Sequence, residues 1–168
     1  MKKVLGELAS RTGRGTELIS LYVPPKKALH EVSSSLRNEH GEASNIKSDQ
    51  TREHVQGALV KTMQRLKLYN QTPTKGLAVF CGALATDGPG SEVLMIQEVT
   101  PPKPIGTYFY RCDDHFHLDI LKDMLKEEKS IGIISIDSTE TGLGIVAGSS
   151  FEVLDVLNSG VSGKHRAG

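Results

Sequence analysis

The chain has 168 residues, of which 38% are apolar and 24% charged, and its formal net charge is zero. This composition indicates one soluble globular domain, and the zero net charge argues against a protein that coats nucleic acid through many phosphate contacts. The longest apolar runs are too short to cross a bilayer, the start has no signal-sequence pattern, and there are only two cysteines, Cys81 and Cys112. We therefore expect a cytoplasmic protein that contacts no membrane.

The first half of the chain predicts one strand among three helices. A short helix is expected over 2–10, and a strand over Leu18–Val23 is apolar at nearly every position, which indicates burial on both faces. A helix follows over 25–39, with Gly41 expected to end it in a left-handed cap. A third helix is expected over 48–68.

The last two of these helices form a helical hairpin whose tip is residues 42–47. Ile46 is a large apolar side chain in a segment that the hairpin directs toward water, between polar Asn45 and Lys47. Two interpretations are open: Ile46 serves a contact at the tip, or it folds back between the two helices.

The second half of the chain is richer in strands, and its elements are joined by glycine-rich and polar turns. We expect strands over 76–84, 93–99, 106–112, 131–137, 142–147 and 151–157, a turn at 87–90, and a helix over 116–126.

These elements predict an α+β fold in which helices cover a mixed β-sheet as an α/β sandwich, with a protruding helical hairpin. The predicted domain occupies residues 1–158. Residues 159–168 are polar, glycine-rich and basic, which is typical of a linker.

Several motifs resemble one family. The segment 41–48, which contains Asn45-Ile46-Lys47-Ser48, is similar to the NIKS region of archaeal and eukaryotic class-1 peptide chain release factors. Residues 18–21, 64–70 and 110–116, the last with the pattern YxCxxxF, resemble the same family in the same order. The resemblance implies an N-terminal domain that reads mRNA stop codons in the ribosomal A site, with a linker leading into a missing Gly-Gly-Gln catalytic domain.

The resemblance places the hairpin tip against the first codon base. Asn45 offers a donor and an acceptor, Ser48 a hydroxyl, and Lys47 a charge for a phosphate or a uridine carbonyl. Ile46 completes the motif. Glu39, just before the tip, matches a family glutamate beside the codon purines, where a carboxylate accepts the amino group of adenine and repels the oxygen of guanine.

The second motif contributes Tyr110 and Cys112, which face the same side of a strand because they are two residues apart. The tyrosine hydroxyl is expected to reach a purine edge. Phe116 belongs to the same motif, and we interpret it as a packing residue more than as a contact.

Three further residues match the family near the codon. Gly15 and Thr16 fit the first two positions of its Gly-Thr-Ser segment, and Arg52 matches an arginine expected to contact ribosomal RNA. Glu17 replaces the usual serine, so it either adds a charge near the codon or points away from it.

The chain lacks the Gly-Gly-Gln loop, so we expect no catalysis and no cofactor from this part of the protein. A metal site from Cys112, His115 and His117 is not favoured, because the spacing is irregular and a fourth ligand is not evident. The partners implied by the resemblance are the mRNA stop codon, the decoding centre of the small ribosomal subunit and, through missing domains, a translational GTPase.

Two other functions remain open. One is a ribosome-rescue or surveillance factor that enters the A site without reading a codon, which the intact Asn45–Ser48 motif disfavours. The other is a small enzyme that uses Cys112 with His115 or His117.

Overall fold

The computed structural model describes residues 1–85, 92–126, 130–147 and 150–160. The chain divides into two compact units, Met1–Leu125 and Lys126–Gly168. This division falls inside the range 1–158 that the sequence analysis treats as one domain. The predicted domain boundary at residue 158 therefore stays a prediction. Most of the predicted linker, and the predicted turn at 87–90, lie outside the described residues.

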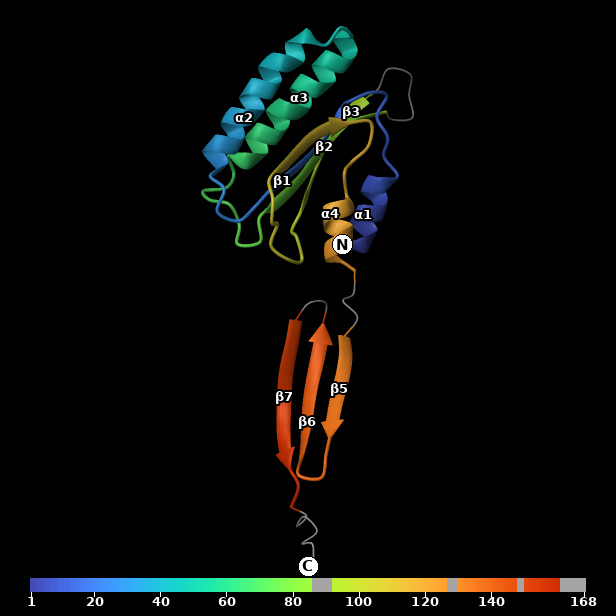
Figure 1. The fold of residues 1–168 in the computed structure, drawn as a ribbon. Helices are drawn as coiled ribbons and strands as arrows, with labels where there is room; N and C mark the ends of the chain where they lie inside the picture. The colour runs from blue at the N-terminus through green and yellow to red at the C-terminus, as the bar shows by residue number, and fades with distance from the viewer. Residues whose placement is uncertain (86–91, 127–129, 148–149, 161–168) are drawn as a thin grey trace, which may run out of the picture. The chain divides into compact units, whose positions relative to one another are not determined.

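The first unit is built on a four-stranded antiparallel sheet of order β3-β2-β1-β4 (Figure 1). β1 lies in the interior of the sheet and is buried at all six positions, as its continuous apolar sequence predicts. The strands are β1 (Leu18–Val23), β2 (Leu77–Ala85), β3 (Glu92–Val99) and β4 (Phe109–Asp113).

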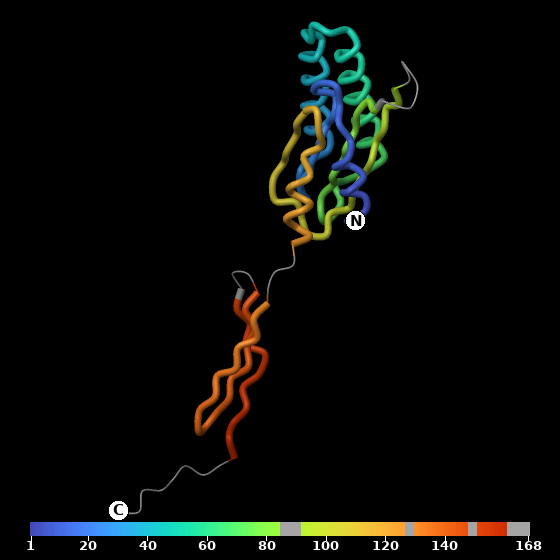
Figure 2. Tube along the Cα trace, turned by 90° about the vertical axis from the view of Figure 1, so that its right-hand side faces the viewer, coloured from blue at the N-terminus to red at the C-terminus, as the bar shows by residue number. Residues whose placement is uncertain are grey.

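Helices cover both faces of this sheet, with one pair on each side (Figures 1 and 2). On one face lie α2 (Leu29–Glu42) and α3 (Asp49–Leu66), which the short 3-10 turn η1 (Ala43–Asn45) joins into the predicted hairpin. On the other face lie α1 (Lys2–Ala9) and α4 (Asp119–Met124). The α+β class and the hairpin are therefore confirmed, although every described strand pair is antiparallel.

Two apolar cores result from this arrangement because alternate residues of each strand face opposite sides. Ile19 and Leu21 of β1 join the core beneath α2 and α3, whereas Leu18 and Tyr22 join the core beneath α1 and α4. Both cores are formed entirely by residues of the first unit. The hydroxyl of Tyr22 donates a hydrogen bond of 2.6 Å to the carbonyl of His117, which fixes the chain between β4 and α4.

The helix α2 differs from the sequence prediction at both of its ends. α2 begins at Leu29 and not at Pro25, because Lys26 adopts a positive φ of 97° and interrupts the chain before the helix. Gly41 does not form a left-handed cap; it lies within α2, and the chain turns through η1 instead. Ser48 caps α3 as predicted, since its hydroxyl accepts a hydrogen bond from the amide of Thr51.

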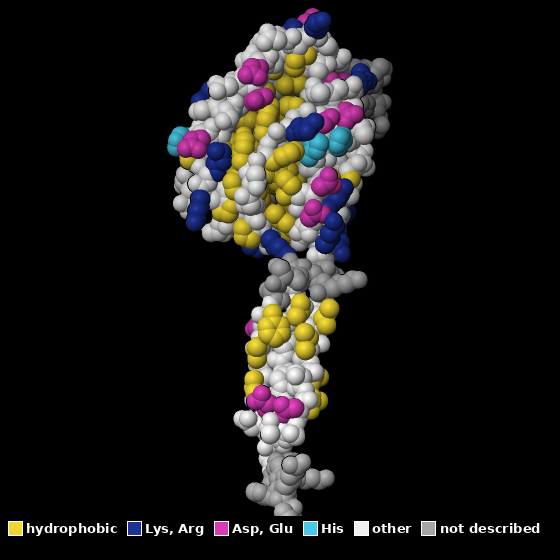
Figure 3. Space-filling model, viewed as in Figure 1, with side chains coloured by type: hydrophobic (Ala, Val, Ile, Leu, Met, Phe, Trp, Pro, Cys, Tyr) yellow, Lys and Arg dark blue, Asp and Glu magenta, His cyan; other side chains and the backbone are white. Residues whose placement is uncertain are grey.

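The second unit is a three-stranded antiparallel sheet of order β5-β6-β7, formed by β5 (Ser130–Ile136), β6 (Glu140–Ala147) and β7 (Ser150–Asn158). Its strands agree with the predicted ranges to within two residues. Among the described residues of the whole chain, no helix has the length and apolar character needed to span a bilayer. The outer strands of this unit expose large apolar side chains (Figure 3), namely Ile131, Ile133, Ile134, Ile136, Phe151, Val153, Leu154, Val156 and Leu157.

Candidate nucleic-acid interface

Several separate chain segments meet at one end of the first unit. Leu18 pairs with Asp113, so β1 begins where β4 ends, and the loop before β1 reaches the same place because Thr12 bridges to His115. α2 runs toward this end and α3 starts from it, so η1 lies there as well, beyond the end of the sheet (Figures 1 and 2). All but one of the sequence-predicted site residues lie on these segments.

The hairpin tip presents three polar side chains to solvent. Asn45, Lys47 and Ser48 are exposed, as predicted. Ile46 is half-buried and packs against the core beneath α2 and α3, which supports the second of its two interpretations. The tip is held in shape by Arg52, whose guanidinium donates a hydrogen bond of 3.0 Å to the carbonyl oxygen of Ile46.

The guanidinium of Arg52 is therefore partly engaged by contacts within the chain. Its other terminal nitrogen forms an ion pair with Asp49 in the first turn of α3. The guanidinium keeps an exposed side, but its main role in this structure is to support the tip from below, which the sequence analysis missed. An arginine six residues after Ile46, at the fourth position of α3, was the available signal.

Glu39 and the motif on β4 face one another. Tyr110 and Cys112 project toward the hairpin and pack against the core beneath it, and the tyrosine hydroxyl lies 3.0 Å from the Cys112 sulfur. Glu39 of α2 is close enough for its charge to contribute to the raised pKa of Tyr110 and of Tyr108. The structure thus brings together the carboxylate and the phenol that the sequence predicted to share one site. Figure 3 shows apolar side chains gathered as a band over this face.

Burial dominates the electrostatics of this group. It is the first cause of the raised pKa of Tyr110 and of Cys112, and it also raises the pKa of Glu39, with a further contribution from the charge of Glu42. Cys112 consequently keeps its proton at neutral pH, the opposite of what a nucleophilic cysteine requires. This direction of the pKa shift does not favour the cysteine enzyme.

Phe116 lies on the other side of the sheet. It is 4% exposed, belongs to the core beneath α1 and α4, and makes an edge-to-face contact with Phe80 at 5.6 Å between ring centroids. It can support the chain after β4 but cannot face a ligand beside Tyr110. The packing interpretation of this residue agrees with its position.

The loop before β1 lies against the start of α3. A Cβ built on Gly15 would stand 3.9 Å from Thr51, and the neighbouring Thr16 is exposed. Glu17 does not present its charge to solvent: it is 4% exposed, and its carboxylate lies 3.4 Å from His54 Nδ1 on α3. Of the two alternatives for Glu17, the structure favours the one in which it points away.

His54 sits between two carboxylates. Its Nε2 lies 2.6 Å from Glu92 at the start of β3, while its Nδ1 faces Glu17. Glu92 also accepts hydrogen bonds from Gln50 and pairs with Arg14 at 3.6 Å. This cluster of five side chains ties the loop carrying Thr16 to α3 and β3. The sequence analysis did not find it, because its members are separated by up to 78 positions.

Replacing His54 by leucine is expected to lower the free energy of unfolding by about 2 kcal/mol, since it leaves the buried Glu17 carboxylate without its partner. Adding Glu17→Gln to the same chain should recover part of the loss, because a neutral amide costs less to bury than a charge. Urea unfolding measures the free energy of unfolding of both variants. The control is His30→Leu, because His30 is an exposed histidine on α2. Unchanged stability of the His54→Leu chain would contradict this role.

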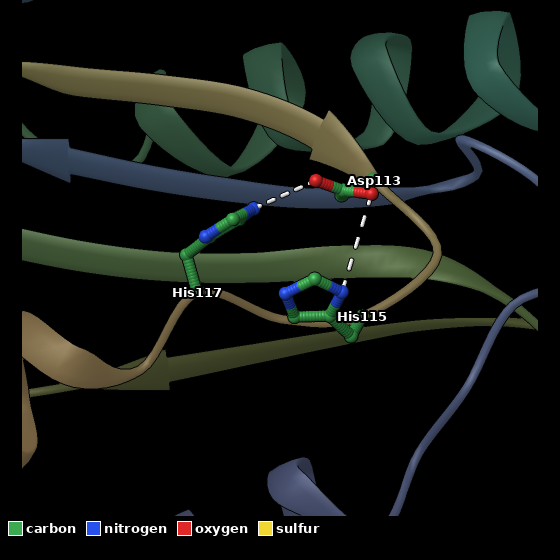
Figure 4. Close-up of side chains that lie close together, drawn as sticks. All are labelled: Asp113, His115 and His117. Atoms are coloured by element: carbon green, nitrogen blue, oxygen red, sulfur yellow. Dashed lines mark hydrogen bonds and ion pairs between the residues drawn. The ribbon is translucent and has the colours of Figure 1, made fainter.

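Asp113, His115 and His117 form a second cluster at the end of β4 (Figure 4). His117 Nε2 lies 3.0 Å from one oxygen of Asp113, and His115 Nδ1 lies 4.0 Å from the other. An amide hydrogen bond from Asp114 and the hydrogen bond to His117 hold the pKa of Asp113 below its usual range. Cys112 is not part of this cluster, since Asp113 takes the place that the sequence analysis weighed for Cys112.

A cavity of about 930 Å³ lies at the opposite end of the hairpin, where α2 begins and α3 ends. Its lining includes Lys26, Lys27, Arg37 and Lys67. None of the sequence-predicted site residues lines this cavity.

The model of the family described as eRF1 domain 1 matches residues 1–126, three quarters of the chain. The chain therefore belongs to the eRF1 family of peptide chain release factors, and its first unit corresponds to the matched domain.

Relatives of the chain carry a more specific description. It is 44% identical over 167 residues to peptide chain release factor subunit 1 of Methanocaldococcus jannaschii, and 46% identical over 167 residues to that of Picrophilus torridus. These matches cover 99% of the chain and 40% of each relative. The chain thus spans about two fifths of the length of the curated relatives it matches.

A solved structure, described as the archaeal translation termination factor aRF1, is also similar, with a TM-score of 0.67 and 35% identity. The match covers 96% of the chain and 44% of the solved one. The likeness at this identity supports both the fold and the family.

Proposed function

We propose that this domain reads the stop codon of an mRNA in the ribosomal A site during translation termination. The observation that carries the proposal is the convergence of four segments at one end of the first unit. Asn45, Lys47 and Ser48 are exposed at the tip, and Glu39 of α2 and Tyr110 of β4 lie on segments that lead to this end, with Tyr110 opposite Leu21 in the middle of β1. The packing of the hairpin on one face of the sheet holds these groups in fixed relation.

Single-stranded codon bases expose their Watson–Crick edges to such a surface. Lys47 supplies a positive charge for a phosphate or a uridine carbonyl, and Asn45 supplies both a donor and an acceptor. Glu39 discriminates between the purines, because its carboxylate accepts a hydrogen bond from the amino group of adenine and repels the carbonyl oxygen of guanine. One adenine satisfies it and two guanines do not, which admits UAA, UAG and UGA and rejects UGG.

The surroundings of Glu39 suit this discrimination. Burial and the charge of Glu42 raise its pKa, so its carboxylate is less well solvated than an exposed one. Poor solvation makes an unmatched guanine oxygen more costly, since water cannot compensate for the lost hydrogen bond. Thr16, on the loop that the His54 cluster anchors, lies at the same end and is available to the third base.

The intact protein would act through parts that lie beyond the matched domain. We propose that a catalytic domain carrying a Gly-Gly-Gln loop triggers hydrolysis of peptidyl-tRNA and that a translational GTPase assists it. This domain itself contributes recognition and no catalysis, and it works in the cytoplasm on the small-subunit decoding centre. The family match and the names of the relatives support the role in peptide chain release, on which these proposals build.

The test uses a full-length release factor of this family in which the present chain replaces the matching N-terminal part. Peptide release is measured on ribosomes programmed with UAA, UAG, UGA or UGG. We expect release at the first three codons only. Lys47→Ala should lower the release rate at all three by roughly 10- to 100-fold, the equivalent of one hydrogen bond to a charged group.

Lys3→Ala provides the matched control, since Lys3 is an exposed lysine on α1 at the other face of the sheet. Normal release by the Lys47→Ala factor would overturn the assignment of the tip. Release that proceeds equally well with an empty A site would favour the alternative function, a rescue factor that enters the ribosome without reading a codon.

A further inference from the structure

We propose that Asp113, His115 and His117 bind one divalent transition-metal ion, with Zn²⁺ as the ion that this ligand set suits best. Two imidazoles and one carboxylate are ligands that zinc accepts, with water completing the coordination. The site lies at the end of β4 and uses none of the side chains assigned to codon reading. It is a binding site in its own right, independent of the proposed function.

The geometry of the three side chains fits an ion. Their ligand atoms all lie within 4.8 Å of one another, and the two distances to Asp113 are 3.0 Å from His117 and 4.0 Å from His115. Ligand atoms around a tetrahedral zinc lie roughly 3.3 Å apart, given bonds of about 2.0–2.1 Å. The exposed side chain of His115 has the furthest to move, and a shift of about 1.5 Å closes a separation of 4.8 Å to that spacing.

The backbone that carries the ligands is held in place from several sides. The amide of His117 donates to the hydroxyl of Ser20 at 2.9 Å, and its carbonyl accepts from Tyr22 at 2.6 Å. His115 bridges to Thr12, so the loop before β1 holds the third ligand. A ligand set whose backbone is fixed before binding loses little conformational freedom when the ion arrives.

Two neighbouring groups compete with the ion for its ligands. A carboxylate oxygen of Asp114 lies 2.6 Å from His115 Nδ1. The Nε of Arg111 lies 3.4 Å from a carboxylate oxygen of Asp113. Both are exposed side chains at the surface, so both can turn away into water at small cost. Asp114 can also approach the ion as an additional oxygen ligand.

An ion at this site would fix residues 113–117 at the end of β4, and the loop before β1 is hydrogen-bonded to this segment. The amide of Gly13 donates to the carbonyl of Asp114 at 2.6 Å, and Gly15 and Thr16 follow in the same loop. Binding should therefore slow hydrogen exchange at the amide of Gly13. This effect separates the proposed site from histidines elsewhere on the surface.

The test titrates zinc chloride into the chain of residues 1–168 and follows binding by calorimetry. We expect one ion per chain, and we expect His115→Ala and His117→Gln each to weaken binding at least about tenfold, because even the loss of a group that only orients a metal ligand costs about that much. His30→Ala and Cys112→Ala, which change a distant histidine and the neighbouring thiol, should leave the affinity unchanged. Hydrogen exchange at Gly13 supplies the second readout.

Circular dichroism of each variant checks that the fold is retained, and His115 is 55% exposed, so its removal leaves the core intact. The proposal is overturned if no saturable binding of one ion occurs. It is equally overturned if either histidine variant binds zinc as tightly as the unchanged chain, or if Cys112→Ala abolishes binding.

Discussion

Replacing Glu39 by glutamine is expected to let a release factor that carries this domain terminate at UGG. The carboxylate only accepts hydrogen bonds, whereas the glutamine amide can also donate one to the carbonyl oxygen of guanine. The penalty against two guanines then disappears. Since a hydrogen bond to a charged group contributes about 1.5–3 kcal/mol, the preference for UAA over UGG should shrink by roughly 10- to 100-fold.

The measurement is the ratio of release rates at UAA and UGG for the chimeric factor and its variant. Glu7→Gln is the matched control, because Glu7 is an exposed glutamate on α1. An unchanged ratio of release rates in the Glu39→Gln factor would show that residues other than Glu39 discriminate between the purines. The charge of Glu39 also has a consequence for the pH dependence of release.

Burial raises the pKa of Glu39, so this carboxylate takes up a proton at a higher pH than an ordinary glutamate. The acceptor is present above that pKa and is lost as the pH falls through it. Release at UAA should therefore decline on acidification at a higher pH in the unchanged factor than expected for an exposed glutamate. The Glu39→Gln factor, which has nothing to protonate at this position, should lack that step.

Replacing Gly82 by alanine is expected to destabilise the first unit severely. A Cβ at this position on β2 would stand 2.7 Å from the carbonyl oxygen of Glu17 and 2.5 Å from a methyl group of Leu18. The oxygen belongs to the backbone of the chain entering β1, so it cannot turn aside. We expect a loss of about 3 kcal/mol or more, at the upper end of the cost of overpacking a core.

Such a loss is a large fraction of the stability of a typical domain, roughly 5–15 kcal/mol. The midpoint of urea unfolding, followed by circular dichroism, measures it. Gly6→Ala on α1 is the control, because a Cβ there meets nothing within 4 Å and alanine favours a helix. If Gly82→Ala is as stable as the Gly6→Ala chain, the close approach of β1 and β2 is not as described.

Local sequence patterns predicted the elements well where one physical signal dominated. The continuous apolar run of β1 gave its bounds and its burial on both faces, and Ser48 gave the start of α3. The helical-hairpin pattern correctly predicted exposed polar side chains at the tip. The left-handed cap predicted at Gly41 was wrong. Gly41 lies inside α2, because the residues after it continue the helix and turn through η1.

Long-range contacts were beyond the reach of the sequence. Nothing in the local pattern indicates that His54 lies between Glu17 and Glu92, because strand pairing decides which distant residues meet. The same limit applies to Asp113: an irregular spacing concealed the arrangement in which both histidines approach one carboxylate. The division at residue 125 was also missed, since secondary structure alone does not reveal which sheet a strand joins.

The most direct test of the codon-reading surface is a zero-length photocrosslink. An mRNA carrying 4-thiouridine as the first base of UAA is bound to ribosomes with the full-length chimeric factor, irradiated and digested. We predict that the crosslinked peptide contains residues 45–48 and that Lys47→Ala reduces its yield. A crosslink confined to α1 or to the strands β5–β7 would contradict the account.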